Sequence, residues 1–341
     1  MKKLSLLFLL ISTFLYSQKF KIDTLLTDKI SIRAIQLWDG KVWYAGTDSK
    51  FGFVNLKDKT YRKQNIISDK KLEFRTLAQN KSHFYIINIL SPAYVFVVDK
   101  QKIIPRLLTQ DTLKTAFFDS FIFDKSERGI AISDPNEKGS PNPMMFGLKY
   151  GKPGEKMKTD FPKYFPGEAH FAASNTNIAL YKDEVWIATG GVKARIFKFN
   201  WSNPYKWEAF ETPFTQGTSS QGIYSIDFYS NTFGIAVGGD YTKPNDNINN
   251  IATTNDGGQT WQIQASGQNA GYMTCVKFRP KTKGKEIVAI GDQHISFSSD
   301  YGKTWTKISV EKNLYACEWA DKNTLILAGK DKIIRLKFSD K

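Results

Sequence analysis

Cysteine, histidine and arginine are scarce in this 341-residue chain, which has two Cys, three His and only eight Arg among its 48 basic residues. Two Cys and three His are too few for a zinc finger or another cluster of metal-binding cysteines. The net charge of +15 therefore rests mostly on scattered lysines, whereas sequence-specific binding of nucleic acid favours clustered arginines. We expect no metal, no cofactor and no nucleic-acid partner.

A long apolar run occurs only at the amino terminus. Residues 1–3 are Met-Lys-Lys, residues 4–15 are almost entirely apolar, and a small residue, Ser17, precedes Gln18. The run is shorter than the roughly 20 residues of a transmembrane helix, so it predicts a signal peptide over residues 1–17 rather than a membrane anchor. We expect a monomeric mature chain without a transmembrane segment, located outside the cytoplasm in the periplasm or secreted.

Helical periodicity is also missing, whereas short apolar or alternating segments separated by turn residues recur throughout the chain. Such segments are typical of β-strands. They group into units that begin near residues 31, 73, 117, 169, 222, 272 and 314, a spacing of about 40 to 50 residues that matches propeller blades. Residues 18–341 are therefore predicted to form one all-β domain, a seven-bladed β-propeller with four-stranded antiparallel blades.

The two ends of the chain complement each other in this scheme. The last unit supplies only three strands, and a lone strand over residues 20–26 precedes the first unit. We expect this N-terminal strand to pair into the last blade as its outer strand, which closes the ring and covers an exposed edge.

Two segments share the pattern Ser/Thr-x-Asp-x-Gly-x-Thr-Trp, known as an Asp box. Each Asp could be catalytic or part of a calcium loop, but such a loop needs several more oxygen ligands than these turns offer. We favour a structural turn, in which Asp accepts backbone N–H groups, Gly permits positive φ and Trp packs between sheets. The residues are Thr254, Asp256, Gly258, Thr260 and Trp261, and Ser298, Asp300, Gly302, Thr304 and Trp305.

With two Asp boxes in a repeated β chain, the protein resembles the BNR/Asp-box β-propellers, and in particular single-propeller proteins related to the photosystem II stability/assembly factor group. The resemblance spans nearly the whole mature chain as architecture. It is sharpest over residues 117–305, for example in segments 129–135, 186–191 and 234–240. It implies a propeller that acts as a binding or assembly module.

One face of such a propeller gathers polar residues. The loops that enter the innermost strands share a face with the loops that join the second and third strands, and here the second strands end in turns rich in Asp and Gly. These residues either bind a protein or a carbohydrate or simply make turns, and the polar loop 240–250 is the most suggestive segment. The candidate ligand-binding residues are Arg33, Arg75, Asp134, Glu168, His170, Arg195, Asp240, Tyr241, Asp292 and His294.

Enzymatic alternatives are weaker. Sialidases also carry Asp boxes and an arginine cluster, which Arg33, Arg75 and Arg195 could supply, but those enzymes have six blades and an Arg-Ile-Pro signature that is missing here. Xyloglucan-type hydrolases use a cleft between two propellers. A generic glycosidase needs two carboxylates ~5–10 Å apart, and the candidates are Asp134, Glu168 and Asp240. No Gly-x-Gly-x-x-Gly opens a helix, which excludes a dehydrogenase. We favour a non-enzymatic binding module, with a glycoside hydrolase as the alternative.

The two cysteines, Cys275 and Cys317, are 42 residues apart and occupy equivalent places on the innermost strands of neighbouring units. An exported protein permits a disulfide. Equivalent positions can nevertheless lie farther apart than the about 7 Å between Cα atoms that a disulfide tolerates. We favour two buried free thiols without a catalytic role.

Overall fold

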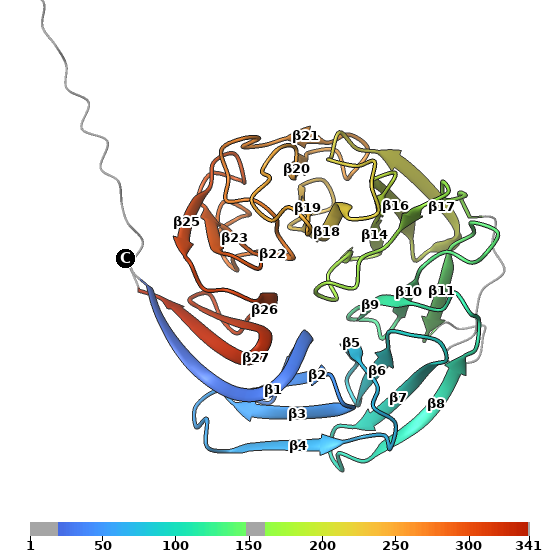
Figure 1. Ribbon diagram of the computed structural model, residues 1–341, viewed down its shortest axis with the longest axis vertical. Helices are drawn as coiled ribbons and strands as arrows, with labels where there is room; N and C mark the ends of the chain where they lie inside the picture. Colours follow the sequence, from blue (N-terminus) through green and yellow to red (C-terminus); the bar gives the residue numbers. More distant parts are fainter. Residues whose placement is uncertain (1–19, 148–160, 340–341) are drawn as a thin grey trace, which may run out of the picture.

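The computed structural model describes residues 20–147 and 161–339, so the predicted signal peptide lies outside the described residues. The described residues form β-strands joined by turns and loops. Among them we find no helix with the length and apolar character needed to cross a membrane. The strands form hydrogen-bonded sheets arranged in a ring (Figure 1), which is the architecture of a β-propeller.

The first sheet joins the two ends of the described chain. Its six strands, in spatial order, are β26 (Leu314–Trp319), β27 (Thr324–Phe338), β1 (Phe20–Trp38), β2 (Lys41–Gly46), β3 (Lys50–Asn55) and β4 (Arg62–Ile66). The next two sheets are β5 (Phe74–Gln79), β6 (His83–Asn88), β7 (Ala93–Asp99) and β8 (Pro105–Asp111), and then β9 (Phe118–Phe123), β10 (Gly129–Ser133) and β11 (Asn142–Phe146).

The remaining three sheets complete the ring. One contains β13 (Ile178–Tyr181), β14 (Glu184–Ala188), β16 (Arg195–Asn200) and β17 (Asn203–Glu211). Another contains β12 (Glu168–Ala169), β15 (Gly190–Gly191), β18 (Gln221–Phe228), β19 (Gly234–Asp240), β20 (Ile251–Thr254) and β21 (Gln262–Ile263). The last contains β22 (Cys275–Phe278), β23 (Ile287–Ile290), β24 (Ile295–Ser298) and β25 (Thr306–Ser309).

The prediction of seven uniform four-stranded blades is therefore wrong, because the described residues form six sheets with three to six strands each. The main reason is β1, which is continuous over 19 residues. Its first part pairs with β27 and its second part pairs with β2, so the units expected at the two ends of the chain share one sheet. The short strands β12 and β15 likewise extend the sheet of β18–β21 beyond four strands.

The expected pairing of the N-terminal strand with the last unit is present. Residues from Phe20 to Leu26 lie opposite residues from Phe338 to Ile333 in an antiparallel register. The carboxylate of Asp23 accepts a hydrogen bond of 2.6 Å from Nη2 of Arg335 across this pair. The two ends of the described chain are thus joined side by side in one sheet (Figure 1).

The core lies between neighbouring sheets, where their apolar faces meet. Trp186 on β14 stacks on Phe228 of β18 with ring centroids 3.7 Å apart, and Trp261 meets the same Phe228 edge-on at 6.1 Å. Trp43 on β2 and Phe84 on β6 form a similar contact at 4.7 Å. Large aromatic side chains bury the most apolar area per residue, so the Trp186–Phe228 and Trp43–Phe84 contacts hold adjacent sheets together face to face.

The first Asp box follows β20 and forms a compact turn. The amides of Gln259 and Thr260 each donate a hydrogen bond of 3.0 Å to Oδ1 of Asp256. Partial burial raises the pKa of Asp256, but the hydrogen bonds from Thr260 and its neighbours prevail and lower this pKa to about 2. Gly258 has a φ of +88°, and its carbonyl accepts a 3.0 Å hydrogen bond from the indole of Trp261. These contacts occupy the carboxylate within its own turn.

The second Asp box, after β24, repeats this geometry. The amide of Thr304 donates to Oδ1 of Asp300 at 2.9 Å, and the indole of Trp305 donates to the carbonyl of Gly302 at 2.9 Å. The hydroxyl of Ser298 accepts a 2.9 Å hydrogen bond from the amide of Gly302, as that of Thr254 does from Gly258 in the first turn at 3.0 Å.

Candidate functional site

Five strands that lie toward the centre of the ring carry a β-bulge in their pairing with the next strand along the chain. At each bulge the pairing register slips by one residue, which leaves one residue of the strand without a partner opposite it. Bulges re-aim a side chain and are frequent beside functional sites. The bulged residues are Arg33 on β1, Arg75 on β5, Asp119 on β9, Tyr224 on β18 and Tyr315 on β26.

In β5, β9, β18 and β26 the bulge lies within the first four residues of the strand, and in β1 it lies where the pairing passes from β27 to β2, so the five bulges lie on the same face of the ring. We call this the bulge face, and the opposite face, which carries both Asp boxes, the Asp-box face. Arg33, Asp119 and Tyr315 come one or two residues before side chains that line a central cavity of about 260 Å³. The bulged residues therefore surround the mouth of the propeller channel.

Arg33 contacts residues from two other parts of the ring. Its guanidinium carbon lies 4.0 Å above the ring of Tyr315, and its Nη1 donates a 3.1 Å hydrogen bond to the carbonyl of Ala173. Its Nε is buried and has no hydrogen-bond partner among the described residues. Burial first, and then the nearby charge of Arg75, lower the pKa of Arg33. Arg33 is thus a fixed cation with an unused donor, which favours binding of a polar or anionic group.

Asp119 is the most deeply buried charged side chain at this mouth, with an exposed fraction of 0%. Neither of its carboxylate oxygens has a hydrogen-bond partner among the described residues. Burial and then repulsion from Asp134 raise the pKa of Asp119 well above its usual value, against the opposing charge of Arg75. A buried carboxyl without a partner is costly unless it is neutral or meets a water molecule or a ligand.

A tyrosine cluster adjoins Arg33. Tyr224 stacks on Phe171 at a centroid distance of 3.9 Å and meets the edge of Tyr272 at 4.8 Å. Beside this cluster, Oδ1 of Asp292 and Nε2 of His294 are buried without a hydrogen-bond partner among the described residues. Burial lowers the pKa of His294 to about 4, so its ring is neutral at pH 7. The mouth therefore combines aromatic surface with unused donors and acceptors.

Glu168, one of the predicted catalytic carboxylates, is held by structural contacts. Arg195 donates two hydrogen bonds to it, from Nε at 2.9 Å and from Nη2 at 2.7 Å. The hydroxyl of Thr189 and the amide of Phe165 donate two more, at 2.7 and 2.9 Å. The side chains of Glu168 and Arg195 are 0% and 9% exposed. Glu168 therefore accepts four hydrogen bonds from its neighbours, and Arg195 is its main partner.

The other two predicted carboxylates also have local partners. Asp240 caps the turn after β19, where its Oδ1 accepts the amide and the hydroxyl of Thr242 at 2.9 and 2.6 Å. Asp134 accepts the amide of His170 at 3.0 Å, and the ring of His170 is in turn bound between the hydroxyl of Tyr164 and the carbonyl of residue 188. Burial raises the pKa of Asp134 to about 6, although the hydrogen bond from His170 opposes this shift.

These contacts bear on the enzymatic alternatives. The number of sheets no longer separates this chain from six-bladed sialidases. However, Arg195 pairs with Glu168 and Arg75 donates a 2.7 Å hydrogen bond to Glu73, so these two arginines are already bound to carboxylates. In residues 20–147 and 161–339, no group of three His, Cys, Asp or Glu side chains is arranged to hold a metal ion.

Exposed apolar side chains flank the mouth. Phe165, Val192, Tyr241 and Ile248 are 44%, 37%, 54% and 59% exposed, and we call this set the apolar rim. Phe165 and Val192 lie in loops beside β12 and β15, while Tyr241 and Ile248 lie in loop 240–250. Backbone hydrogen bonds link these loops through segment 215–217, from residue 217 to residue 191 at 2.9 Å and from residue 215 to residue 249 at 2.8 Å. The rim is therefore a continuous set of connected loops.

Loop 240–250 presents its exposed side chains from an ordered backbone. The side-chain amide of Asn250 donates to the carbonyl of Gly271 at 2.8 Å, and that of Asn247 donates to the carbonyl of Asn269 at 3.0 Å. The amide of Tyr272 donates to the carbonyl of Pro244 at 3.0 Å. A loop held by such contacts loses little conformational entropy when it binds a partner.

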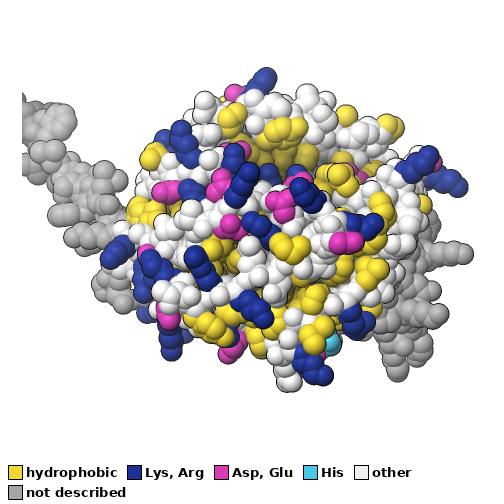
Figure 2. All heavy atoms as spheres, turned by 60° about the horizontal axis from the view of Figure 1, so that its bottom comes forward, with side chains coloured by type: hydrophobic (Ala, Val, Ile, Leu, Met, Phe, Trp, Pro, Cys, Tyr) yellow, Lys and Arg dark blue, Asp and Glu magenta, His cyan; other side chains and the backbone are white. Residues whose placement is uncertain are grey.

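Charged side chains, unlike the apolar side chains of the rim, are not gathered in one place. On the side of the ring that Figure 2 shows, Lys and Arg side chains are dispersed and are interspersed with Asp, Glu and apolar side chains. No single basic patch covers this view, which agrees with the scattered lysines of the sequence.

The structure places Arg75 and Asp292 near Arg33 at the mouth and His294 beside the tyrosine cluster. It assigns local structural contacts to Glu168, Arg195, Asp134, His170 and Asp240. Sequence reasoning missed Asp119, Tyr272 and Tyr315. A signal for Asp119 existed, because it follows Phe118 as Arg75 follows Phe74 in the preceding unit. The exposure of Phe165 and Ile248 had no such signal, since it depends on how the loops pack.

No protein-family model and no curated protein sequence matches the chain. Solved structures do match. One, described as YCF48 bound to D1 peptide, is 13% identical, with 94% of this chain and 97% of that chain covered and a TM-score of 0.63. A streptogramin B lyase is 12% identical over 94% and 98% of the two chains, with a TM-score of 0.68. The structure of U3-55K is 10% identical over 93% and 98%, with a TM-score of 0.64. At such low identity the likeness shows the fold alone, and the fold is a β-propeller.

Proposed function

We propose that this protein is a non-enzymatic binding module whose bulge face holds a segment of a partner protein. The observation that carries the proposal is the apolar rim beside a channel mouth with unused polar atoms. Exposed aromatic and aliphatic side chains next to a few fixed polar groups are the composition of a protein-binding surface. Arginine and tyrosine, both present at this mouth, are the residues that most often dominate binding energy.

The two parts of the surface favour a peptide-like ligand. Tyr241 and Ile248 offer apolar area from an ordered loop, and the Nε of Arg33 and Oδ1 of Asp292 offer a donor and an acceptor without partners among the described residues. An extended chain carries apolar side chains and polar backbone groups in alternation, so it can satisfy both parts at once. The neighbour described as YCF48 bound to D1 peptide supports the view that a propeller of this kind can take a peptide.

A saccharide ligand fits the rim less well. Two of the four rim side chains, Val192 and Ile248, are aliphatic and suit an apolar protein segment, whereas the rings of Phe165 and Tyr241 can contact either kind of ligand. A glycoside hydrolase is disfavoured because Glu168 is saturated by Arg195 and Asp240 is bound within its own turn.

The two Asp-box motifs support a relation to the BNR/Asp-box propellers, and the apolar run at residues 4–15 supports export of the protein. Export is tested by the N-terminal sequence of the protein recovered from its native cells. A mature chain that begins near Gln18 is expected, and a chain that retains residues 1–17 contradicts export.

The class of ligand is tested by three parallel experiments. Phage-displayed random peptides and a glycan array are each probed with the purified protein, and a panel of aryl glycosides is assayed for turnover. We expect enrichment of a peptide motif that contains apolar residues, without saccharide binding or turnover. Binding of saccharides without peptides, or hydrolysis of any glycoside, would overturn the proposal.

A further inference from the structure

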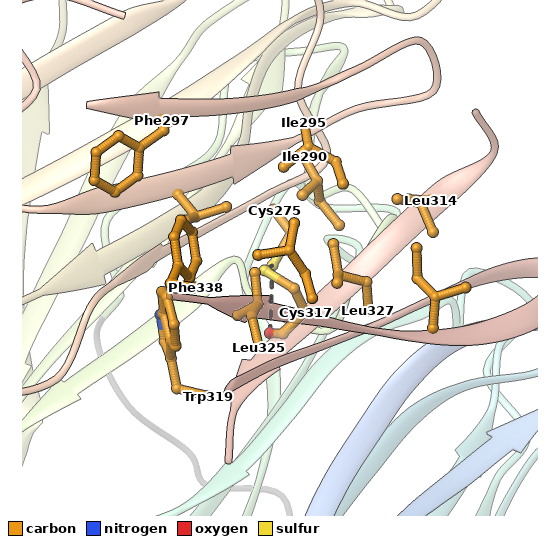
Figure 3. Close-up of a cluster of buried hydrophobic side chains, with 13 residues drawn as sticks. Cys275, Ile290, Ile295, Phe297, Leu314, Cys317, Trp319, Leu325, Leu327 and Phe338 are labelled. Atoms are coloured by element: carbon orange, nitrogen blue, oxygen red, sulfur yellow. Dashed lines mark hydrogen bonds between the residues drawn. The ribbon is translucent and has the colours of Figure 1, made fainter. Parts of the chain in front are cut away.

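Two thiols face each other in the core between the sheet of β22–β25 and the sheet that contains β26. Cys275 begins β22 and Cys317 lies within β26, and both are free and buried. Their side chains point toward one another in Figure 3, and the two sulfur atoms are 3.6 Å apart. The surrounding cluster is otherwise apolar and includes Leu314, Leu325 and Leu327.

The pair adjoins the channel. Cys317 lines the central cavity of about 260 Å³, and so does Thr176, whose hydroxyl lies 3.7 Å from the sulfur of Cys275. A small polar molecule that enters the channel therefore comes within one side chain of both sulfur atoms.

The electrostatic setting separates the roles of the two thiols. Burial raises the pKa of Cys275, but the hydrogen bond from the thiol of Cys317 and the charge of Lys277 prevail and lower it. The hydrogen bond to Cys275, and then burial, raise the pKa of Cys317 well above its usual value. Cys275 is accordingly the more acidic thiol of the pair, and the thiolate that it forms on losing its proton is the nucleophilic form.

We propose that Cys275 and Cys317 form an oxidisable pair, which a small hydroperoxide converts into a disulfide that bridges β22 and β26. The thiolate of Cys275 attacks the hydroperoxide, an S–O bond forms, the O–O bond breaks, and the leaving hydroxide takes up a proton to become water. The thiol of Cys317 then attacks the sulfenic sulfur, an S–S bond forms, and a second water leaves. Two thiols and one hydrogen peroxide thus give one disulfide and two waters.

The geometry allows this step with little movement. A disulfide has an S–S distance of about 2.05 Å, so side-chain rotation must bring the sulfur atoms closer by roughly 1.5 Å from their separation of 3.6 Å. The bridge would link the sheet of β22–β25 covalently to the sheet that holds both ends of the chain. Cross-linking residues 42 positions apart restricts the unfolded chain, so it raises the melting temperature.

The test treats the folded, reduced protein with hydrogen peroxide and follows it by intact mass and by peptide mapping. We expect a linked pair of peptides that contain Cys275 and Cys317, the loss of two hydrogen atoms, a higher melting temperature and full reversal by dithiothreitol. The Cys317→Ser variant should instead hold one oxygen on Cys275, trapped by dimedone. Separate, stably oxygenated cysteines in the wild type, or thiols that react only after unfolding in urea, would overturn the proposal.

A second measurement addresses the route through the channel. Cumene hydroperoxide is much larger than hydrogen peroxide, whereas both oxidise a free thiol in solution. For each oxidant we compare the oxidation rate of the folded protein with that of the urea-unfolded chain. We expect this ratio to be at least about tenfold higher for hydrogen peroxide than for cumene hydroperoxide, because both thiols are buried and the smaller oxidant reaches them more readily. Equal relative rates for the two oxidants would contradict access through the cavity. Neither result depends on whether the bulge face binds a peptide.

Discussion

Replacing Glu168 with Gln tests whether this carboxylate is structural. The substitution keeps the shape of the side chain but removes its charge, so the guanidinium of Arg195 loses two hydrogen bonds to a carboxylate. The pair is buried, with side chains 0% and 9% exposed. Breaking a buried ion pair by removal of one partner typically costs about 3–5 kcal/mol of unfolding free energy. We expect E168Q to lose an amount in this range.

The assay is urea unfolding at pH 7, followed by tryptophan fluorescence, with a check that the dependence on urea concentration is unchanged. The matched control is Glu211→Gln, whose carboxylate meets Lys193 at 3.2 Å with side chains 58% and 38% exposed. An exposed pair contributes no more than about 1 kcal/mol, so this variant should unfold nearly as the wild type does. A Glu168 variant that unfolds like this control would refute the structural role and would return Glu168 to the catalytic candidates.

Three further perturbations follow from the fold. Trp261→Ala should lower the unfolding free energy by about 3–5 kcal/mol, since it empties a buried site, and an unchanged urea midpoint would contradict this. Burial raises the pKa of Asp134 to about 6, so the protonated carboxyl stabilises the folded state fully below pH 4, and this stabilisation is lost as pH rises through 6. Relative to Asp134→Asn, the unfolding free energy of the wild type should therefore fall by roughly 2–3 kcal/mol between pH 4 and pH 7, as measured by urea titration at both pH values. A difference in unfolding free energy between the two proteins that is the same at both pH values would contradict this. Deletion of residues 20–28 removes the strand paired with β27 and should cause aggregation by light scattering, whereas a monomer with an unchanged melting temperature would show that closure is unimportant.

The ring architecture was predictable because each unit carries alternating apolar strands and turn residues at a regular spacing. The pairing of the two ends was predictable from a three-stranded last unit and a lone strand at residues 20–26. The number of sheets was not. The polar segment around Asp28 reads as a break between strands, yet β1 continues through it with a register shift, and Lys50 pairs with Asp28 at 2.8 Å.

The candidate site was only partly predictable. Arg33 and Arg75 follow an apolar residue at the start of an innermost strand, and this position recurs from unit to unit. The bulge that turns these side chains toward the channel depends on pairing with the next strand, which the sequence does not display. The same applies to Glu168 and Arg195, because their mutual neutralisation arises only when two loops pack together.

The most direct test of peptide binding at the bulge face compares two double variants by calorimetric titration with a peptide selected against the wild type. Tyr241→Ala/Ile248→Ala removes two side chains of the apolar rim. Tyr229→Ala/Tyr301→Ala removes two side chains of the Asp-box face that are 40% and 42% exposed. We predict that the rim variant weakens binding at least about tenfold, whereas the Asp-box-face variant changes it less than about twofold. Equal affinities for all three proteins, or a loss confined to the Asp-box-face variant, would contradict a binding site on the bulge face.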